Sequence, residues 1–164
     1  MTEYILFSEN YEETFKIGVA LGKTSRPGSV YALIGGLGAG KTVLAKGIAK
    51  GLGVEDEPSS PTFVIMSEYE GKFPLYHFDV YRLSQSDELD ILGYQDFFCS
   101  DGVCVIEWAD KIIDELPKDT VIIEVSIFED KENIDNQDKR ILKIKGSSEW
   151  VSLFKNTVEP ALQT

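Results

Sequence analysis

The sequence is poor in the side chains that build metal centres and disulfide frameworks. It has one histidine, His77, and two cysteines, Cys99 and Cys104, with no further Cys or His at zinc-binding spacing. Cys104 lies inside an apolar run, so we interpret it as a small core side chain. This scarcity argues against a zinc site and a secreted disulfide scaffold, and it indicates a cytoplasmic protein with reduced thiols.

Long apolar runs are absent as well. The run Val30–Ile34 is typical of the longest, whereas a membrane-spanning helix needs about 20 apolar residues. Glu3 stands where a secretory signal has its basic region, and no apolar stretch of signal length follows. We therefore expect a protein without a membrane segment or a secretory signal.

Positive charge is scarce. There are 16 Lys and Arg residues against 28 Asp and Glu residues, which gives a formal net charge of -12. Proteins that bind nucleic acid unaided usually present a basic face, because neutralising phosphates supplies much of the affinity. The arginines are only Arg26, Arg82 and Arg140, and the lysines form no cluster. We expect no strong direct binding to nucleic acid; such an acidic surface suits solubility or a basic protein partner.

The overall composition is that of an ordinary folded domain, and residues 1–164 fit a single one. Helical patterns alternate with buried strands in the first half, and hairpin-like strand pairs dominate the second half. This order predicts an α/β protein with a three-layer P-loop NTPase-type fold and a mixed, partly antiparallel sheet. Strands are expected at residues 2–7, 29–34, 62–70, 73–81, 103–106, 120–128 and 140–145. Helices are expected at residues 10–25, 41–52 and 110–116, near Ser84, and from Ser147 or Ser148.

Local signals mark some of these boundaries. Ser8 is the candidate N-cap of the first helix, because a serine hydroxyl can accept a bond from a free helical N–H group. Gly71 and Lys72 separate two strand-like runs, which is typical of a hairpin turn. The acidic stretch 129–139 is expected to be a loop between the last two strands.

The segment Gly35–Thr42, GGLGAGKT, matches the P-loop pattern G-x-x-x-x-G-K-[ST] between a predicted strand and a predicted helix. Glycines let successive backbone N–H groups turn toward a phosphate, and the helix amino terminus adds its positive end. We expect Lys41 to reach the β- and γ-phosphates and the Thr42 hydroxyl to bind Mg²⁺. The predicted nucleotide-contacting residues are Gly36, Leu37, Gly38, Ala39, Gly40, Lys41, Thr42 and Trp108. A glycine-rich turn without a ligand does not account for Lys41 and Thr42 following the glycines.

Two acids are candidates for the other half of such a site. Glu107 ends an apolar strand-like run, and Asp79 shares one face of its predicted strand with His77 and Tyr81. An acid on a strand beside a P-loop holds Mg²⁺ or orients the attacking water. The alternative for each is a carboxylate that faces solvent or caps the next helix.

Other polar residues allow two interpretations. Thr62 and Ser60 follow the loop after the P-loop helix, where a hydroxyl can sense Mg²⁺ and the γ-phosphate, but they also suit a plain turn. His77 is either a structural group or a catalytic one. Trp108 either forms a wall of the phosphate site or enters the core, and Arg82 either pairs with a neighbouring acid or contacts phosphate.

Four segments in series resemble the TsaE (YjeE/YdiB) family. They are GGLGAGKT at 35–42, SPTF at 60–63, HFDVYRL at 77–83 and VIEW at 105–108. The first is generic, whereas the others in this order are specific, and the resemblance spans about residues 5 to 145. It implies a small ATPase required for forming N6-threonylcarbamoyladenosine in tRNA. Such a protein acts with the TsaD–TsaB pair and does not itself transfer the carbamoyl group.

The same resemblance implies roles for particular residues. Lys41 and Thr42 would hold phosphate and Mg²⁺, and Glu107 would bind Mg²⁺. Asp79 and Thr62 would serve the hydrolysis step, with Asp79 a further candidate ligand of the metal. Intrinsic turnover of ATP is expected to be weak, and strong direct binding to tRNA is not expected.

One position departs from the family. The second P-loop residue is usually an acid and is Gly36 here; because the phosphate-binding loop needs only backbone at that point, we expect nucleotide binding to survive.

The resemblance also bears on the base of the nucleotide. The family's amino-terminal segment, which lies near the adenine, corresponds to Ser8–Thr14. A guanine-reading Asn-Lys-x-Asp motif is absent, which favours ATP. Two alternatives stay open: a nucleotide-gated interaction module with little turnover, and a small-molecule P-loop kinase, which a chain with so few arginines suits poorly.

Overall fold

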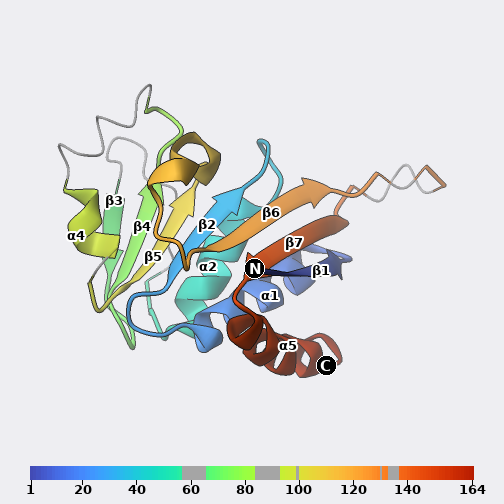
Figure 1. The fold of residues 1–164 in the computed structure, drawn as a ribbon. Helices are drawn as coiled ribbons and strands as arrows, with labels where there is room; N and C mark the ends of the chain where they lie inside the picture. Colours follow the sequence, from blue (N-terminus) through green and yellow to red (C-terminus); the bar gives the residue numbers. More distant parts are fainter. Residues whose placement is uncertain (57–65, 84–92, 99, 130, 133–136) are drawn as a thin grey trace.

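The computed structural model describes residues 1–56, 66–83, 93–98, 100–129, 131–132 and 137–164. Their strands form one seven-stranded sheet in the order β1-β7-β6-β2-β5-β4-β3 (Figure 1). The strands are β1 (Thr2–Ser8), β2 (Val30–Ile34), β3 (Met66–Tyr69), β4 (Leu75–Asp79), β5 (Val103–Glu107), β6 (Val121–Ile127) and β7 (Arg140–Gly146). The helices are α1 (Tyr11–Thr24), α2 (Lys41–Gly51), α4 (Tyr94–Phe98), the 3-10 helix η1 (Ala109–Glu115) and α5 (Ser148–Leu162).

The sheet is parallel at its centre and antiparallel toward its edges. β2 pairs in parallel with β5 and β6, and β4 pairs in parallel with β5. The pairs β3–β4, β6–β7 and β1–β7 are antiparallel. The predicted mixed sheet is therefore confirmed. Because β2, β4 and β5 run in one direction, their carboxyl ends meet at one edge of the sheet, which is where α/β sheets bind ligands.

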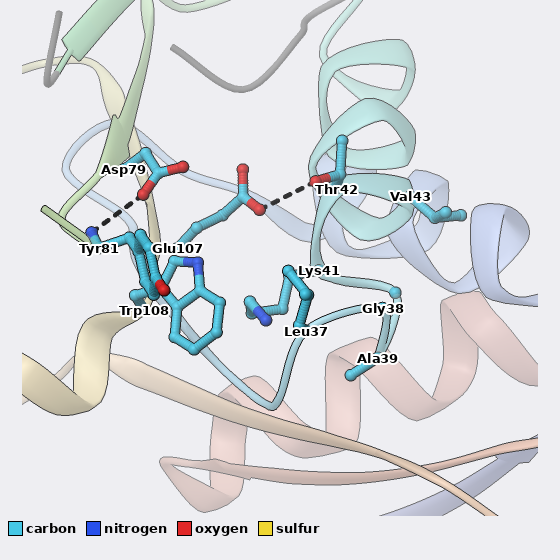
Figure 2. Close-up of a pocket in the computed structure, with 11 residues that line it drawn as sticks. Leu37, Gly38, Ala39, Lys41, Thr42, Val43, Asp79, Tyr81, Glu107 and Trp108 are labelled. Carbon is cyan, nitrogen blue, oxygen red and sulfur yellow. Dashed lines mark hydrogen bonds between the residues drawn. The ribbon is translucent and has the colours of Figure 1, made fainter. Parts of the chain in front are cut away.

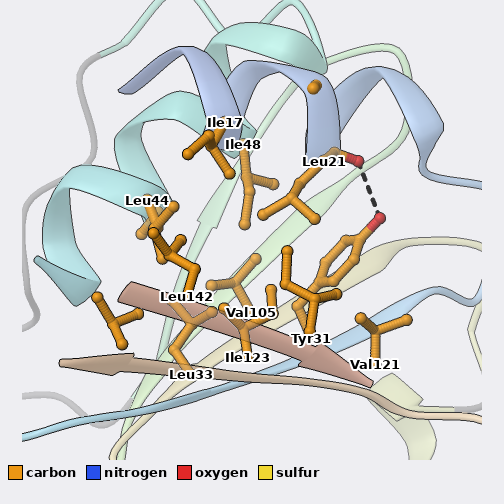
Figure 3. Close-up of a cluster of buried hydrophobic side chains, with 14 of the residues drawn as sticks. Ile17, Leu21, Tyr31, Leu33, Leu44, Ile48, Val105, Val121, Ile123 and Leu142 are labelled. Atoms are coloured by element: carbon orange, nitrogen blue, oxygen red, sulfur yellow. Dashed lines mark hydrogen bonds between the residues drawn. The ribbon is translucent and has the colours of Figure 1, made fainter. Parts of the chain in front are cut away.

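Helices pack on both faces of the sheet. α1, α2 and α5 cover one face, as Figure 1 shows, and build the larger core there. In Figure 3, side chains of α1 and α2 point toward the strands: Ile17, Leu21, Leu44 and Ile48. The labelled side chains on the strands that face them are Tyr31, Leu33, Val105, Val121, Ile123 and Leu142. On the opposite face, α4 and η1 pack against the alternate residues of β2, β4 and β5. Cys104 is buried in that second core, as expected.

Helices α1 and α2 touch backbone to backbone through glycines. A Cβ atom added at Gly18 would stand 2.9 Å from the Gly47 Cα, and one added at Gly22 would stand 2.9 Å from the Gly51 Cα. Glycine is a poor helix former, so its presence at four helical positions needs a packing reason. The reason is this close approach, which brings the amino ends of α1 and α2 side by side.

Tyr31 is wholly buried between α1 and the sheet. Its hydroxyl donates to the Leu21 carbonyl oxygen at 2.9 Å and lies 2.9 Å from the Ser25 hydroxyl (Figure 3 draws the first of these bonds). Burial raises the pKa of the Tyr31 phenol to about 12, because the charged form would lose its hydration.

This raised pKa predicts a loss of stability at high pH. The unfolded chain releases the Tyr31 proton near its ordinary pKa of 10, whereas the folded chain keeps it to about 12. The free energy of unfolding should therefore fall by about 3 kcal/mol between these limits, with the contribution intact below the lower one. Urea unfolding of the parent and Tyr31→Phe across this range measures it. A parent that loses no more stability than Tyr31→Phe would contradict the prediction.

The start of α1 differs from the sequence prediction. Ser8 is not the N-cap, since it is the last residue of β1; Asn10 is, and its Oδ1 accepts from the Glu13 N–H at 2.9 Å. The Ser8 hydroxyl donates instead to the Asn10 carbonyl oxygen and pairs with the Thr14 hydroxyl at 2.6 Å. Serine and asparagine are both good N-cap residues, so residue type alone could not decide between them. The prediction was wrong because β1 continues one residue further than the apolar pattern indicated.

Other boundaries also moved. The predicted hairpin is present, but β4 is shorter than the predicted strand at 73–81 and the chain turns after Asp79. The predicted helix at 110–116 is the 3-10 helix η1, and α4 was not predicted at all. Ser60, Thr62, Cys99 and the helix expected from Ser84 fall outside the described residues. Where the structure is described, no helix has the length and apolar character required to cross a membrane.

Candidate functional site

The Gly35–Thr42 loop leaves the carboxyl end of β2 and leads directly into α2. Gly38 has φ of 77° and Gly40 has φ of 113°, conformations that side-chain-bearing residues rarely adopt. Gly40 is the N-cap of α2 and provides no side chain to bond the first helical N–H groups. These N–H groups are therefore available to an anion at the positive end of the helix.

The loop forms one wall of a pocket of about 450 Å³. The opposite wall comes from the carboxyl ends of β4 and β5, as Figure 2 shows. The lining residues are Leu37, Gly38, Ala39, Gly40, Lys41, Thr42, Val43, Asp79, Tyr81, Glu107 and Trp108. A pocket of this size is in the range that holds a small-molecule ligand. Apart from Gly36, it gathers every nucleotide-contacting residue that the sequence predicted.

Lys41 is folded back onto its own loop. Its ammonium group donates to the carbonyl oxygens of Gly35 at 2.6 Å and Gly36 at 2.7 Å, and it lies 3.9 Å from the centre of the Trp108 ring. Burial lowers the pKa of Lys41, and the charges of Glu107, Asp110 and Asp79 oppose that shift. The Lys41 ammonium group is therefore partly desolvated, and the oxygens of a bound phosphate could replace the two carbonyl oxygens as its hydrogen-bond acceptors.

Glu107 connects β5 to the start of α2. Its side chain is buried, and Oε1 accepts from the Thr42 hydroxyl at 3.0 Å (Figure 2). Its Oε2 lies 2.6 Å from Nε2 of His77, which is also buried. We assign the His77 proton to Nε2, since a carboxylate accepts there, while Nδ1 has no partner among the described side chains and backbone. The lone histidine of the chain therefore orients the acid next to the loop.

Asp79 stands beside Glu107 because β4 and β5 are parallel neighbours and the two residues are partners in their register. Its Oδ1 accepts from the Tyr81 N–H at 3.0 Å, which fixes the turn after β4 (Figure 2). Tyr81 packs on Trp108 with ring centres 4.7 Å apart. Trp108 itself has φ of 62°, in the left-handed region, and this conformation turns its ring toward Lys41.

Some expected members of the site are placed elsewhere or lie outside what is described. Thr62 and Ser60 lie outside the described residues. Arg82 is exposed in the turn after β4. A Cβ at Gly36 would meet nothing within 4 Å, so a small side chain could be added there without a clash at its first atom.

The amino-terminal segment does adjoin the loop. A Cβ on Gly40 would stand 3.7 Å from Cγ2 of Thr14 and 4.0 Å from Nε of Arg140. Arg140 begins β7, and its guanidinium donates to the carbonyl oxygens of Ala39 and Gly38. The sequence prediction missed this arginine, since nothing in its local pattern joins residue 140 to a loop 100 residues earlier; only the placement of β7 beside β6 does so.

Comparison with known proteins places this arrangement in a family. The model of the family described as "Threonylcarbamoyl adenosine biosynthesis protein TsaE" matches residues 8–140. A tRNA threonylcarbamoyladenosine biosynthesis protein TsaE from Treponema pallidum is 42% identical over 123 residues, which are 75% of this chain and 91% of the relative. The protein of that name from Bacillus subtilis is 44% identical over 124 residues, 75% of this chain and 77% of the relative.

A solved structure agrees with the sequence comparison. The crystal structure of YdiB from Bacillus subtilis superposes with a TM-score of 0.74 at 32% identity, covering 95% of this chain and 94% of that one. The likeness therefore extends over nearly the whole length of both chains. Since the family model also matches most of the length, the chain belongs to the TsaE family.

Proposed function

We propose that this chain binds ATP with Mg²⁺ and hydrolyses it slowly, as an accessory ATPase for forming N6-threonylcarbamoyladenosine in tRNA with TsaD and TsaB. One observation carries the ATP site: the start of α2, which has no side-chain cap, bears Lys41 and a Thr42 hydroxyl already bonded to buried Glu107. The biological role rests on membership of the TsaE family, whose relatives bear the name of that modification.

The side chains around α2 suit a nucleotide-bound Mg²⁺. Thr42 and Glu107 offer two oxygens 3.0 Å apart, and Asp79 lies next to Glu107 in the register of the sheet. Mg²⁺ is usually held by one or two protein oxygens, phosphate oxygens and water rather than by a full protein cage. When bound, the ion would neutralise charge on the β- and γ-phosphates.

The remaining residues divide the work by position. The backbone N–H groups at the start of α2 and the Lys41 ammonium bind the phosphates, and Trp108 closes the pocket beside Lys41. Asp79 is the acid best placed to orient a water, because its Oδ2 is left to the pocket while Oδ1 holds the turn. Thr62 remains a proposed contributor to hydrolysis.

Two features favour slow turnover and a protein partner. Fast phosphoryl transfer needs positive side chains around the phosphoryl group, and of the pocket-lining residues that the structure describes, Lys41 alone is basic. The net charge of -12 leaves little basic surface for tRNA, so we propose that TsaD and TsaB hold the tRNA in the cytoplasm. A nucleotide-gated interaction module differs from this proposal only in its rate of ATP hydrolysis.

A small-molecule kinase would need further basic side chains to stabilise the transferred phosphoryl group.

The direct test is reconstitution. TsaD, TsaB, tRNA and a threonylcarbamoyl donor are combined with ATP, with or without this chain, and the modified nucleoside is measured. We expect product only with the chain, and ADP release that rises when the partners are present. Submicromolar tRNA binding by the isolated chain at physiological salt would contradict the division of labour, and γ-phosphate on an acceptor other than water would favour the kinase.

Glu107→Gln is expected to lower ATP turnover by about a hundredfold, because the amide keeps the shape of the side chain but loses the charge that attracts Mg²⁺. Binding of ATP in the presence of EDTA should stay within about threefold of the parent, measured by calorimetry. Glu149→Gln is the matched control, since that side chain is 83% exposed and remote in the fold. Equal loss of turnover and of metal-free binding would contradict the role of Glu107.

A further inference from the structure

Arg140 reaches the Gly35–Thr42 loop from the far side of the pocket. Its Nε donates to the Ala39 carbonyl oxygen at 2.9 Å and its Nη2 to the Gly38 carbonyl oxygen at 3.3 Å. Its Nη1 donates to the carbonyl oxygens of Lys139 and Gln137. All four bonds that the described residues make with this guanidinium go to backbone carbonyls. Arg140 is therefore placed to brace backbone rather than to neutralise an acid.

The two bonds to the loop fix the orientation of two peptide units. Every described peptide bond is trans, so each N–H points away from the carbonyl of the same unit. The carbonyl of Gly38 shares a unit with the N–H of Ala39, and the carbonyl of Ala39 shares one with the N–H of Gly40. Holding both carbonyls toward Arg140 therefore turns both N–H groups to the other side. The N–H of Ala39 closes the loop onto the Gly36 carbonyl oxygen at 3.2 Å.

This brace matters because the loop lacks stiffness of its own. Gly38 and Gly40 flank Ala39 with φ of 77° and 113°, and glycine adopts many other conformations at little cost. A hydrogen bond from a charged donor is stronger than one between neutral groups, and a fork of two fixes direction as well as distance. The guanidinium also places positive charge behind the N–H groups of an anion site.

We infer that Arg140 is a positioning residue for phosphate binding: it holds the Gly38 and Ala39 carbonyls so that the N–H groups at the start of α2 stay ordered for the β-phosphate. The inference rests on the proposed ATP site. It assigns the loop a support that comes from the opposite end of the chain, and it distinguishes Arg140 from Arg26, whose exposed side chain pairs with Glu149 at 3.5 Å.

The experiment compares Arg140→Ala and Arg140→Lys with the matched control Arg26→Gln. Calorimetry with Mg-ATP should show a Kd raised about tenfold or more by Arg140→Ala and about threefold to fivefold by Arg140→Lys, which keeps the charge but not the fork. Arg26→Gln should stay within twofold. In the nucleotide-free protein, amide exchange at Ala39, whose N–H is bonded to the Gly36 carbonyl oxygen, should accelerate in Arg140→Ala, while exchange at Leu33 in β2 and the unfolding temperature stay near the parent values.

The outcomes separate this inference from the proposed function. If the parent chain does not bind Mg-ATP, the proposed function fails first. If the parent binds and Arg140→Ala binds within twofold of it, only the positioning role is wrong. Binding by Arg140→Lys equal to the parent would mean that charge alone suffices, which overturns the orienting role. Should Arg140→Ala fail to fold, Arg140→Lys and its Ala39 exchange rate still decide the question.

Discussion

Replacing Lys41 with alanine is expected to weaken ATP binding by at least about a hundredfold. The ammonium group is partly buried, bonded to the Gly35 and Gly36 carbonyl oxygens and placed over the Trp108 ring, so the pocket is already arranged around it. In the ATP complex it would exchange the two carbonyls for phosphate oxygens, and a charge-assisted contact in a partly desolvated place contributes strongly. Calorimetric titration with ATP and ADP gives the two dissociation constants.

Lys50→Ala is the control for that measurement. Lys50 lies on the same helix and is exposed, so its loss changes the net charge equally without touching the pocket. Its Kd for ATP should stay within twofold of the parent. A Lys41→Ala protein that binds ATP as tightly as Lys50→Ala would remove the loop from the proposed ATP site altogether.

The second large effect concerns folding. Gly47→Ala should lower the free energy of unfolding by about 3 kcal/mol or more, although alanine is the better helix former by about 1 kcal/mol. The added Cβ would stand 2.5 Å from the Phe15 carbonyl oxygen and 2.7 Å from the Gly18 Cα. These are backbone atoms of a neighbouring helix, so they cannot rotate away, and α1 and α2 must separate.

Thermal unfolding of Gly47→Ala and of Gly36→Ala measures that cost. Gly36 is the matched glycine, because a Cβ there meets nothing within 4 Å. The first variant should unfold roughly 6 to 12 °C below the parent, and the second should stay within a degree or two. Equal stability of the two variants would show that the helices can move apart freely.

Sequence patterns predicted the parts of the site that lie in short segments. The loop at 35–42 carries its chemistry in eight consecutive residues, and Glu107 and Asp79 each end a strand. Both strands follow the same direction, so the two acids meet at one edge of the sheet. The fold class followed in the same way, from the alternation of helices and buried strands.

Long-range contacts could not be predicted in this way. Nothing near His77 shows that its Nε2 will meet Glu107, because that pairing depends on the register of β4 with β5. Arg140 reaches the loop only because β7 lies next to β6, which lies next to β2. The choice of Asn10 over Ser8 as the N-cap depends on where β1 leaves β7, since pairing extends through Ser8.

The left-handed backbone conformation of Trp108 is unfavourable for a bulky residue, so the presence of tryptophan at this turn needs an explanation. Trp108 is the one residue other than glycine with positive φ in the part of the chain that the structure describes. For a bulky side chain this conformation costs roughly 1–2 kcal/mol, a cost that glycine would avoid. Stability alone would therefore favour glycine at 108, but glycine has no ring to face Lys41. Trp108 therefore makes the turn less stable than glycine would, and in return its aromatic ring forms a wall of the pocket beside Lys41.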